Sequence, residues 1–393
     1  MCGAGRLVEG TMPKLAIVGA SDFQNPLILK AKDMGCETYA FAWECGDIGE
    51  RTANHFFPIS TAEKDKILEV CRSEKIDGIV TIGSDFNNIT ASYVANKMGL
   101  VANSDECVAR STNKHLMRET FLEHGDPSPL SVLVREGEPL PEDLERLTFP
   151  AIVKPTDRSG SRGITKVERR EDLQPALQAS FDVSWEKCAL VEEFLEGEEF
   201  SVEFCSWKGE HHFLQMTRKF TTGAPHFIET GHIEPPLVPA EVLERTQEVV
   251  RHALDSLGVK YGASHSEVKV DARGNVRIVE IGSRMGGDCI GSDLVELSSG
   301  IDFVGAVVDA ALGREPDLRP RHEPRAAGIR FAFGQEDADV FERLQAEHPE
   351  YLVRATEIGP FDSEITDSSN RDGYFIMCAP KADDILPYLT YAQ

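Results

Sequence analysis

The 393-residue sequence lacks two features that would place it in special classes of protein. It has no apolar run near the roughly 18 residues that a membrane helix needs, so we expect no membrane partner. Its nine cysteines are scattered from Cys2 to Cys378 without a CxxC pair, which argues against a zinc site or a disulfide framework. Reduced thiols and an opening MCGAGRLVEG without a signal-peptide core favour a cytoplasmic protein.

Basic residues are also few. The chain holds 41 Lys and Arg against 66 Asp and Glu, a net charge of −25. Nucleic acid and anionic membranes both require a basic face, so neither is expected as a partner. A nucleotide is not excluded, because a local basic pocket can hold phosphates. The length fits two or three domains, and 41% hydrophobic residues is ordinary for a globular protein.

The first hundred residues lack a dinucleotide fingerprint. Lys14–Gly19 reads as a buried strand, a helix follows at Leu27–Met34, and further strands are expected at Thr38–Trp43 and Asp77–Ile82. Strands alternating with helices predict a parallel sheet in an α/β domain. The first strand leads into Gly19-Ala20-Ser21 and not G-x-G-x-x-G, so no dinucleotide site is expected there.

The most informative stretch is a predicted hairpin at Glu267–Ile281. If its loop has four residues, Val270 faces Arg277 and Glu267 lies directly across from Glu280. Opposed carboxylates about 5 Å apart at Cβ destabilise a hairpin, by roughly 3–4 kcal/mol at an effective dielectric near 20. A cation between them would remove that cost, and carboxylate oxygens suit Mg²⁺, which often arrives with phosphates. The alternatives are glutamates that splay into water, or a register one residue off.

A lysine and a small flexible loop form a second motif. Phe149–Pro155 is a short apolar strand that contains Lys154, whose charge must reach a partner or water. The loop Ser159–Gly163 (SGSRG) can turn successive backbone N–H groups toward an anion. It does not match a P-loop. Taken separately, a surface lysine and a plain turn remain possible readings.

A third motif is the acidic segment Leu190–Val202, LVEEFLEGEEFSV. It reads as two strands separated by a turn at Gly197. The backbone of such a strand can meet the edge of an adenine, and a carboxylate beyond it can hold ribose hydroxyls. A solvated acidic rim is the alternative.

These motifs occur in the order found in ATP-grasp enzymes, and from about Lys14 to Phe333 the chain resembles the ATP-dependent carboxylate–amine ligases of that superfamily. The resemblance implies an ATP-grasp fold built of α/β and α+β parts. A Rossmann-like pre-ATP-grasp domain would span residues 1–112, and the ATP-grasp domain 113–315 with a lid subdomain at about 150–200. A small α+β unit would follow at 316–393. The resemblance to this family also implies a homodimer.

The resemblance also implies a role for each matched residue. Arg284 and Lys154 would be catalytic, and Glu267 and Glu280 would bind Mg²⁺. Backbone groups of Glu193 and Leu195 would meet the adenine. The residues implied to bind ATP are Lys114, Lys154, Ser159, Gly160, Ser161, Arg162, Gly163, Glu192, Glu193, Phe194, Leu195 and Glu199, the last at the ribose. Candidates for the substrate side are Arg218, Glu229, His232, Gly286, Gly287 and Asp288, with Lys219 as a further candidate.

The implied activity is the joining of a small-molecule carboxylate to an amine, as between amino acids, through an acyl phosphate with release of ADP and phosphate. One departure is Gly282, where the family usually has an asparagine that binds a second metal ion; Ser283 or water is the expected substitute. The alternatives are carboxylation like that of biotin carboxylase, and a non-catalytic ATP sensor. No Ser-His-Asp or Cys-His arrangement is evident, and the pair His211-His212 reads as structural.

Overall fold

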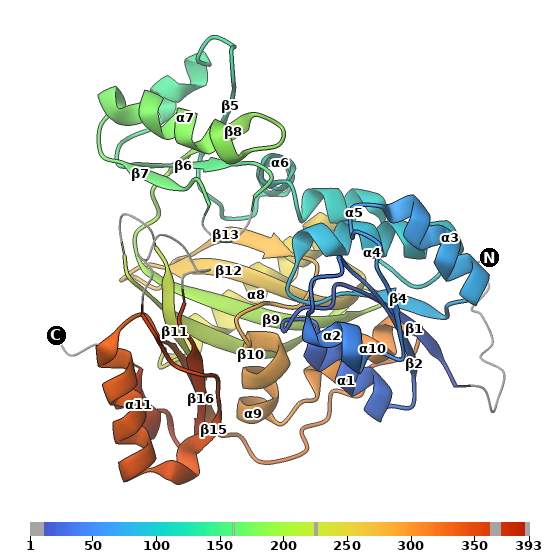
Figure 1. Cartoon of the computed structure of the whole chain (residues 1–393). Helices are drawn as coiled ribbons and strands as arrows, with labels where there is room; N and C mark the ends of the chain where they lie inside the picture. The colour runs from blue at the N-terminus through green and yellow to red at the C-terminus, as the bar shows by residue number, and fades with distance from the viewer. Residues whose placement is uncertain (1–11, 159, 161, 224–226, 362–370, 390–393) are drawn as a thin grey trace.

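The computed structural model describes residues 12–158, 160, 162–223, 227–361 and 371–389. These residues form three β-sheets, at the right, the top and the centre of Figure 1. Within the described ranges, no helix combines the length and the apolar character needed to cross a membrane. The candidate site lies where the three sheets approach one another.

The N-terminal sheet is parallel, with the strand order β3-β2-β1-β4. This confirms the predicted α/β arrangement. The turn after β1 is filled by side chains, because a Cβ on Gly19 would lie 2.8 Å from atoms of both Gln24 and Asn87. The N-terminal sheet and its helices comprise β1 (Lys14–Val18), α1 (Asn25–Asp33), β2 (Glu37–Phe41), α2 (Ile48–Thr52), β3 (His55–Phe57), α3 (Lys64–Glu74), β4 (Gly78–Val80), α4 (Asp85–Met98) and α5 (Asp105–Arg110).

The upper sheet is antiparallel, with the order β5-β8-β6-β7, and α7 packs against it (Figure 1). We call this layer the lid. Helix α6 (Lys114–His124) precedes it in the chain and lies between it and the central sheet in Figure 1. The lid elements are β5 (Ser131–Arg135), β6 (Ala151–Pro155), β7 (Thr165–Val167), α7 (Leu173–Val183) and β8 (Cys188–Glu193).

The central sheet has eight strands in the order β13-β12-β9-β10-β11-β14-β16-β15. The last three strands belong to residues 316–393, so the predicted C-terminal unit continues the central sheet and does not form a sheet of its own. The strands are β9 (Glu198–Trp207), β10 (Glu210–Thr221), β11 (Glu229–Glu234), β12 (Tyr261–Val270), β13 (Val276–Gly282), β14 (Ala326–Phe331), β15 (Leu352–Ala355) and β16 (Tyr374–Ala379). The helices are α8 (Ala240–Leu257), α9 (Val295–Ser299), α10 (Phe303–Ala311), α11 (Gln335–Glu347) and α12 (Ala382–Ile385).

A shared hydrophobic core joins the N-terminal sheet to the central sheet. It contains Leu15 and Ile17 of β1, Cys205 and Leu214 of the central strands, and most of the apolar face of α10. Burial of such apolar surface is the main stabilising contribution to folding. The carboxyl edge of the N-terminal sheet is thereby held against the loop that follows β13, where the N–H of Gly83 donates to the carbonyl of Met285 at 3.1 Å.

Candidate active site

In the hairpin of β12 and β13, Glu267 and Glu280 lie opposite each other as predicted, but the strands pair differently near the loop. The loop is one residue longer than expected, so Val270 pairs with Val276 and the predicted pairing of Val270 with Arg277 is wrong. The register then shifts by one residue at Val279, which forms a β-bulge and restores the opposition of the two glutamates. The bulge is supported from another element, since Arg118 of α6 donates to the carbonyl of Val279 at 2.6 Å.

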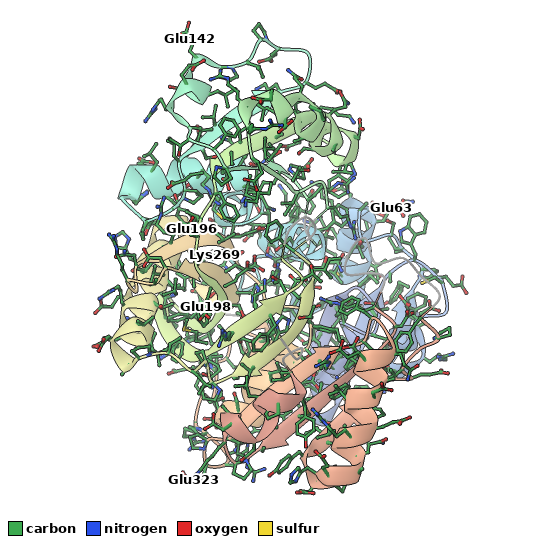
Figure 2. All side chains as sticks on the ribbon, turned by 90° about the vertical axis from the view of Figure 1, so that its left-hand side faces the viewer. Glu63, Glu142, Glu196, Glu198, Lys269 and Glu323 are labelled. Carbon is green, nitrogen blue, oxygen red and sulfur yellow. The ribbon has the colours of Figure 1, made fainter. Side chains whose placement is uncertain are left out.

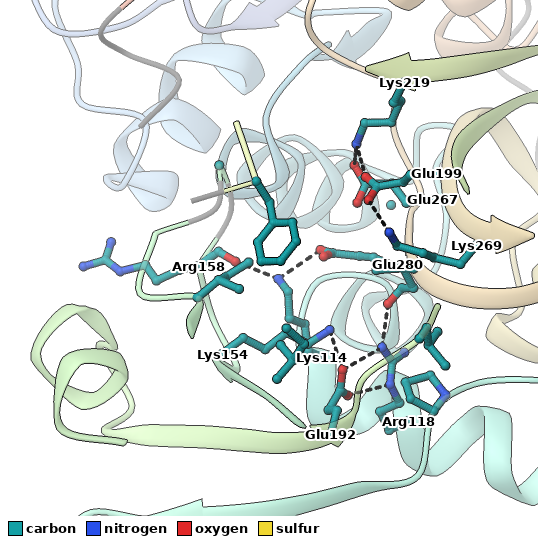
Figure 3. Close-up of a pocket in the computed structure, with 18 of the residues that line it drawn as sticks. Lys114, Arg118, Lys154, Arg158, Glu192, Glu199, Lys219, Glu267, Lys269 and Glu280 are labelled. Atoms are coloured by element: carbon teal, nitrogen blue, oxygen red, sulfur yellow. Dashed lines mark hydrogen bonds and ion pairs between the residues drawn. The ribbon is translucent and has the colours of Figure 1, made fainter. Parts of the chain in front are cut away.

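Glu280 meets the first predicted phosphate lysine. The Nζ of Lys114 lies 3.0 Å from Oε1 of Glu280 and donates to the carbonyl of Arg158 at 2.6 Å (Figure 3). Lys114 is the first residue of α6, and Asn113 caps that helix by accepting hydrogen bonds from two backbone amides. The cap fixes where the helix begins, and this places a buried lysine between the hairpin and the glycine loop.

The second predicted phosphate lysine belongs to a buried ion triad. Oε2 of Glu192 lies 2.7 Å from Nζ of Lys154, and Oε1 lies 2.7 Å from Nε of Arg118 (Figure 3). Burial opposes the charge of Glu192, but Arg118 and Lys154 outweigh it and lower its pKa to about 2. Burial, assisted by Arg118, lowers the pKa of Lys154, and Glu192 opposes that shift. Glu192 thus holds Lys154 in place and also lines the cavity, so its predicted contact with ATP stays a prediction.

Lys219 of β10 meets the other hairpin glutamate. Its Nζ lies 2.8 Å from Oε1 of both Glu199 and Glu267, and 3.5 Å from Oε1 of Glu229. Burial disfavours the charged lysine, but the three carboxylates raise its pKa well above the ordinary value. Burial likewise opposes the charge of Glu267, and Lys219 and His265 hold its pKa well below the usual range.

Arg218, the neighbour of Lys219, does not reach this cluster. Alternate residues of a strand point to opposite faces, and Arg218 pairs instead with Glu198 and lies over the ring of Phe220. The structure therefore gives no support to Arg218 as a substrate contact. Lys219, and not Arg218, lines the cavity.

Arg284 is held by an aspartate from the N-terminal sheet. Nε and one terminal nitrogen of Arg284 bond the carboxylate of Asp85 at 2.7 and 2.9 Å. Burial disfavours the charge of Arg284, but Asp85 raises its pKa above the ordinary value. The same pair explains Gly282, since a Cβ at that position would lie 3.1 Å from the Asp85 carboxylate and 3.2 Å from the guanidinium. An asparagine would be crowded there.

Ser283 does not take over the role of that asparagine. Its hydroxyl hydrogen-bonds the hydroxyl of Ser111 at 2.7 Å, and Asn88 donates to it at 3.3 Å. Ser283 is also almost wholly buried. Of the two expected substitutes, only water remains.

The cavity includes the residues that the resemblance implies for the adenine and the ribose. Glu193, Phe194 and Leu195 line it, together with apolar side chains of Pro129, Ile152, Ile164 and Val279. The N–H of Glu193 already donates to the carbonyl of Leu130 at 2.9 Å, so only its carbonyl group stays a candidate for the adenine. Glu199, the predicted ribose ligand, also lines the cavity and pairs with Lys219 and Lys269.

The glycine loop is described in part. Gly160 lines the cavity, Arg162 is exposed, and Ser159 and Ser161 lie outside the described residues. Gly163 serves the packing of the lid, because a Cβ there would lie 2.5 Å from a methyl group of Val183.

Figure 2 shows Glu196, Glu198 and Lys269 on the face where the lid meets the central sheet.

The other substrate candidates surround the turn that follows Arg284. A Cβ on Gly286 would lie 2.5 Å from the ring of His265, which explains a glycine there, and Gly287 lies beside Gly83 of the N-terminal sheet. Glu229 lines the cavity, whereas His232 is fully buried, with a ring nitrogen 3.6 Å from Asp288. Burial lowers the pKa of His232 against the opposing effect of Asp288, which favours the neutral ring.

The cavity as a whole is balanced in charge and is not basic. Seven Lys and Arg side chains and seven Asp and Glu side chains line it, in a chain with a net charge of −25. Five titratable side chains that line it were missed from the sequence: Asp85, Arg118, Arg158, His265 and Lys269. Arg118 could have been found, since it lies one helical turn after Lys114 and so shares its face. Asp85 follows the end of β4, where ligands of parallel sheets bind.

One Ser-His-Asp line exists away from this cavity. The hydroxyl of Ser206 hydrogen-bonds a ring nitrogen of His211 at 2.7 Å, and the other ring nitrogen lies 3.4 Å from Asp255. Ser206 has no exposed surface, so no substrate can reach its hydroxyl. His211 is buried, as a structural residue would be.

The cavity can hold a magnesium ion only with help from a ligand. Among the described residues, no three acidic, His or Cys side chains are grouped so that they could hold a metal ion. Glu267 and Glu280 alone would leave the remaining positions to phosphate oxygens and water, which is the usual state of Mg²⁺ in nucleotide enzymes.

Comparison with known proteins agrees with this geometry. Residues 147–292 match the family model of the ATP-grasp domain. The chain contains an ATP-grasp domain. Over 96% of its length, and 96% of the other chain, the fold is similar to the crystal structure of an L-amino acid ligase from Bacillus licheniformis, with a TM-score of 0.78 and 20% identity. The predicted ATP-grasp fold is thus confirmed.

Two curated relatives are similar in sequence. Carnosine synthase 1 of Homo sapiens is 25% identical over 387 residues, which cover 88% of this chain and 46% of that protein. Alanine–anticapsin ligase of Bacillus subtilis (strain 168) is 24% identical over 277 residues, which cover 65% of this chain and 58% of that protein. The chain spans about half the length of these curated relatives.

Proposed function

We propose that the protein is an ATP-dependent ligase that joins a carboxylate to an amine through an acyl phosphate and releases ADP and phosphate. The observation that carries this proposal is the content of one cavity. It holds the opposed Glu267 and Glu280, the buried Lys154, and Arg284, between the lid and the central sheet. The names of two similar proteins, an L-amino acid ligase and an alanine–anticapsin ligase, support the same reaction class.

In the first step, a substrate carboxylate oxygen attacks the γ-phosphorus of ATP, and the bond to the β-phosphate oxygen breaks to release ADP. Lys114 and Lys154 would hold the phosphates, since phosphoryl transfer depends on positioning and charge neutralisation. Arg284 would hold the reacting carboxylate or balance charge on the transferred group. Glu267 and Glu280 would bind Mg²⁺, which would supply Lewis-acid stabilisation of the phosphate oxygens.

In the second step, the substrate ammonium loses a proton to water, the resulting amine attacks the acyl carbon, phosphate leaves, and the departing phosphate takes the second proton of the nitrogen. No side-chain nucleophile is needed. The lid would exclude water from the acyl phosphate, which hydrolysis would otherwise destroy. The apolar end of the cavity would hold the adenine, and Glu199 the ribose.

The experiment is a coupled assay of ADP release over all pairs of the proteinogenic amino acids. We expect release that requires a carboxylate and an amine together, and no release with Glu280→Gln. Tight ATP binding without turnover on any pair would favour the sensor instead. Release that depends on bicarbonate would favour carboxylation. Full activity of Glu280→Gln would contradict the metal assignment.

A further inference from the structure

A line of alternating charges runs from the candidate metal carboxylates to the C-terminal segment. Lys219 pairs with both Glu267 and Glu229, and Glu229 pairs in turn with Arg371. Arg371 is the first described residue after the gap at 362–370 and precedes β16. One terminal nitrogen of Arg371 lies 2.7 Å from Oδ1 of Asp288, and the other lies 2.8 Å from Oδ2. Arg371 thus binds the turn that follows Arg284 through the carboxylate of Asp288.

Arg371 is held by two further contacts besides its ion pair with Asp288. Its guanidinium lies 3.6 Å from the centre of the Phe331 ring, and it donates to Oε2 of Glu229 at 3.2 Å. The adjacent Asp372 donates its N–H to the carbonyl of Ala332 at 2.8 Å, which ties this part of the chain to β14. A planar guanidinium that both stacks and binds a carboxylate with two nitrogens is not replaceable by lysine.

The turn gripped by Arg371 has unusual backbone. Asp288 and Cys289 both have positive φ, 53° and 60°, and a π-helical turn follows at Ile290–Leu294. Such conformations in residues other than glycine cost of order 1–3 kcal/mol each and persist where the surroundings hold them. Burial opposes the charge of Asp288, but Arg371 and His232 hold its pKa well below the usual range. The two-nitrogen contact of Arg371 holds the Asp288 side chain of this turn.

The ends of this turn carry opposite charges. Arg284 is cationic and belongs to the acyl and phosphoryl side. Asp288 and Glu229 are two carboxylates that share one guanidinium, and 24% of the Asp288 side chain and 18% of the Glu229 side chain stay exposed. Lys219 is shared with two further glutamates, so it does not cancel the remaining negative charge.

We propose that Arg371 is a positioning residue for the amine substrate: it orients Asp288 and Glu229 so that they receive a substrate ammonium group beside Arg284. The C-terminal segment thereby completes the acceptor side of the site. This inference rests on the proposed ligase function. It also gives the substrate class, an amine that arrives as a cation, such as an amino acid.

The test separates the two half-reactions. Hydroxylamine traps an acyl phosphate as a hydroxamate and is too small to need the acceptor side. In Arg371→Met we expect the hydroxamate rate and the KM for ATP to stay within about twofold of the wild type, while the KM for the amine rises about tenfold or more. Arg371→Lys should recover only part of this loss. The matched control is Arg343→Met, an arginine of the same segment that donates to the carbonyl of Pro387; it should behave as the wild type.

A second readout needs no substrate. Amide hydrogen exchange at Gly286–Cys289 should be about tenfold faster in Arg371→Met than in Arg343→Met, because the turn loses its support. An unchanged amine KM, a parallel fall of both half-reactions, or unchanged exchange would each overturn the inference. If the wild type forms neither hydroxamate nor amide with any amino acid, the proposed function fails, and exchange alone then decides whether Arg371 positions the turn.

Discussion

Replacing Glu192 by glutamine is the sharpest single test of the site, because the change removes one charge and almost no volume. Arg118 and Lys154 would then be left in a buried position without their carboxylate. Breaking a buried ion pair by removing one partner costs about 3–5 kcal/mol. We expect Glu192→Gln to lower the free energy of unfolding by that amount at pH 7.

The pKa of Glu192 gives an independent magnitude. It falls from 4.5 to about 2 on folding, which corresponds to about 3 kcal/mol. Because the folded pKa is the lower one, this stability is present above pH 4.5 and is lost as the pH falls toward 2. The wild type should therefore lose about 3 kcal/mol more than Glu192→Gln over that interval.

The assay is urea unfolding across pH, with ADP binding measured by calorimetry on the same samples. Without Glu192, burial and Arg118 further lower the pKa of Lys154, so ADP affinity should fall as well. The control is Glu193→Gln, one residue along the same strand, whose carboxylate is 38% exposed and pairs with Arg277. Exposed pairs contribute about 0–1 kcal/mol. Equal, small losses of stability in the two variants would refute the reasoning.

Three further outcomes follow from other contacts. Burial raises the pKa of Glu234 from 4.5 to about 8, so the wild type should lose about 5 kcal/mol of stability as the pH rises from 4.5 to 8; unfolding of Glu234→Gln should lack that slope. Asp85→Asn should lower kcat by about 100-fold in the ADP-release assay while the KM for ATP changes little, because Arg284 loses its orientation. Arg158 lies 3.6 Å from the ring centre of Trp185 on the lid, and its carbonyl accepts a hydrogen bond from Lys114. Because ADP is proposed to contact Lys114, its binding should change the emission of Trp185, and Trp185→Phe should abolish that change.

Much of the fold could be predicted because its signals are local. The strand predicted at Lys14–Gly19 is β1 (Lys14–Val18), and the helix predicted at Leu27–Met34 agrees with α1 (Asn25–Asp33) to within two residues at each end. The pairing of β14 with β11 carries no local signal. It could not be inferred, and residues 316–393 were therefore predicted as a separate unit although their strands extend the central sheet.

The site shows the same division. Glu267 and Glu280 were placed across from each other by counting, yet their opposition depends on a bulge at Val279 whose carbonyl is held by Arg118 from a distant helix. Which of Arg218 and Lys219 faces the cavity is a matter of strand parity, which the sequence did not fix. The ion pair of Glu192 with Arg118 could not be read from the sequence, because no sequence rule reveals a partner 74 residues away.

The charge balance of the cavity bears on how an acidic protein accepts a polyanion. Glu192, Glu280 and Glu267 are paired with Lys154, Lys114 and Lys219. In the proposed reaction, ATP brings phosphates that compete for the lysines, and Mg²⁺ brings charge that satisfies the hairpin glutamates. Binding then exchanges ion-pair partners and leaves few buried charges without one, which matters because an unpaired buried charge costs several kcal/mol. A strongly basic pocket is thus not needed, and the net charge of −25 is no obstacle to ATP.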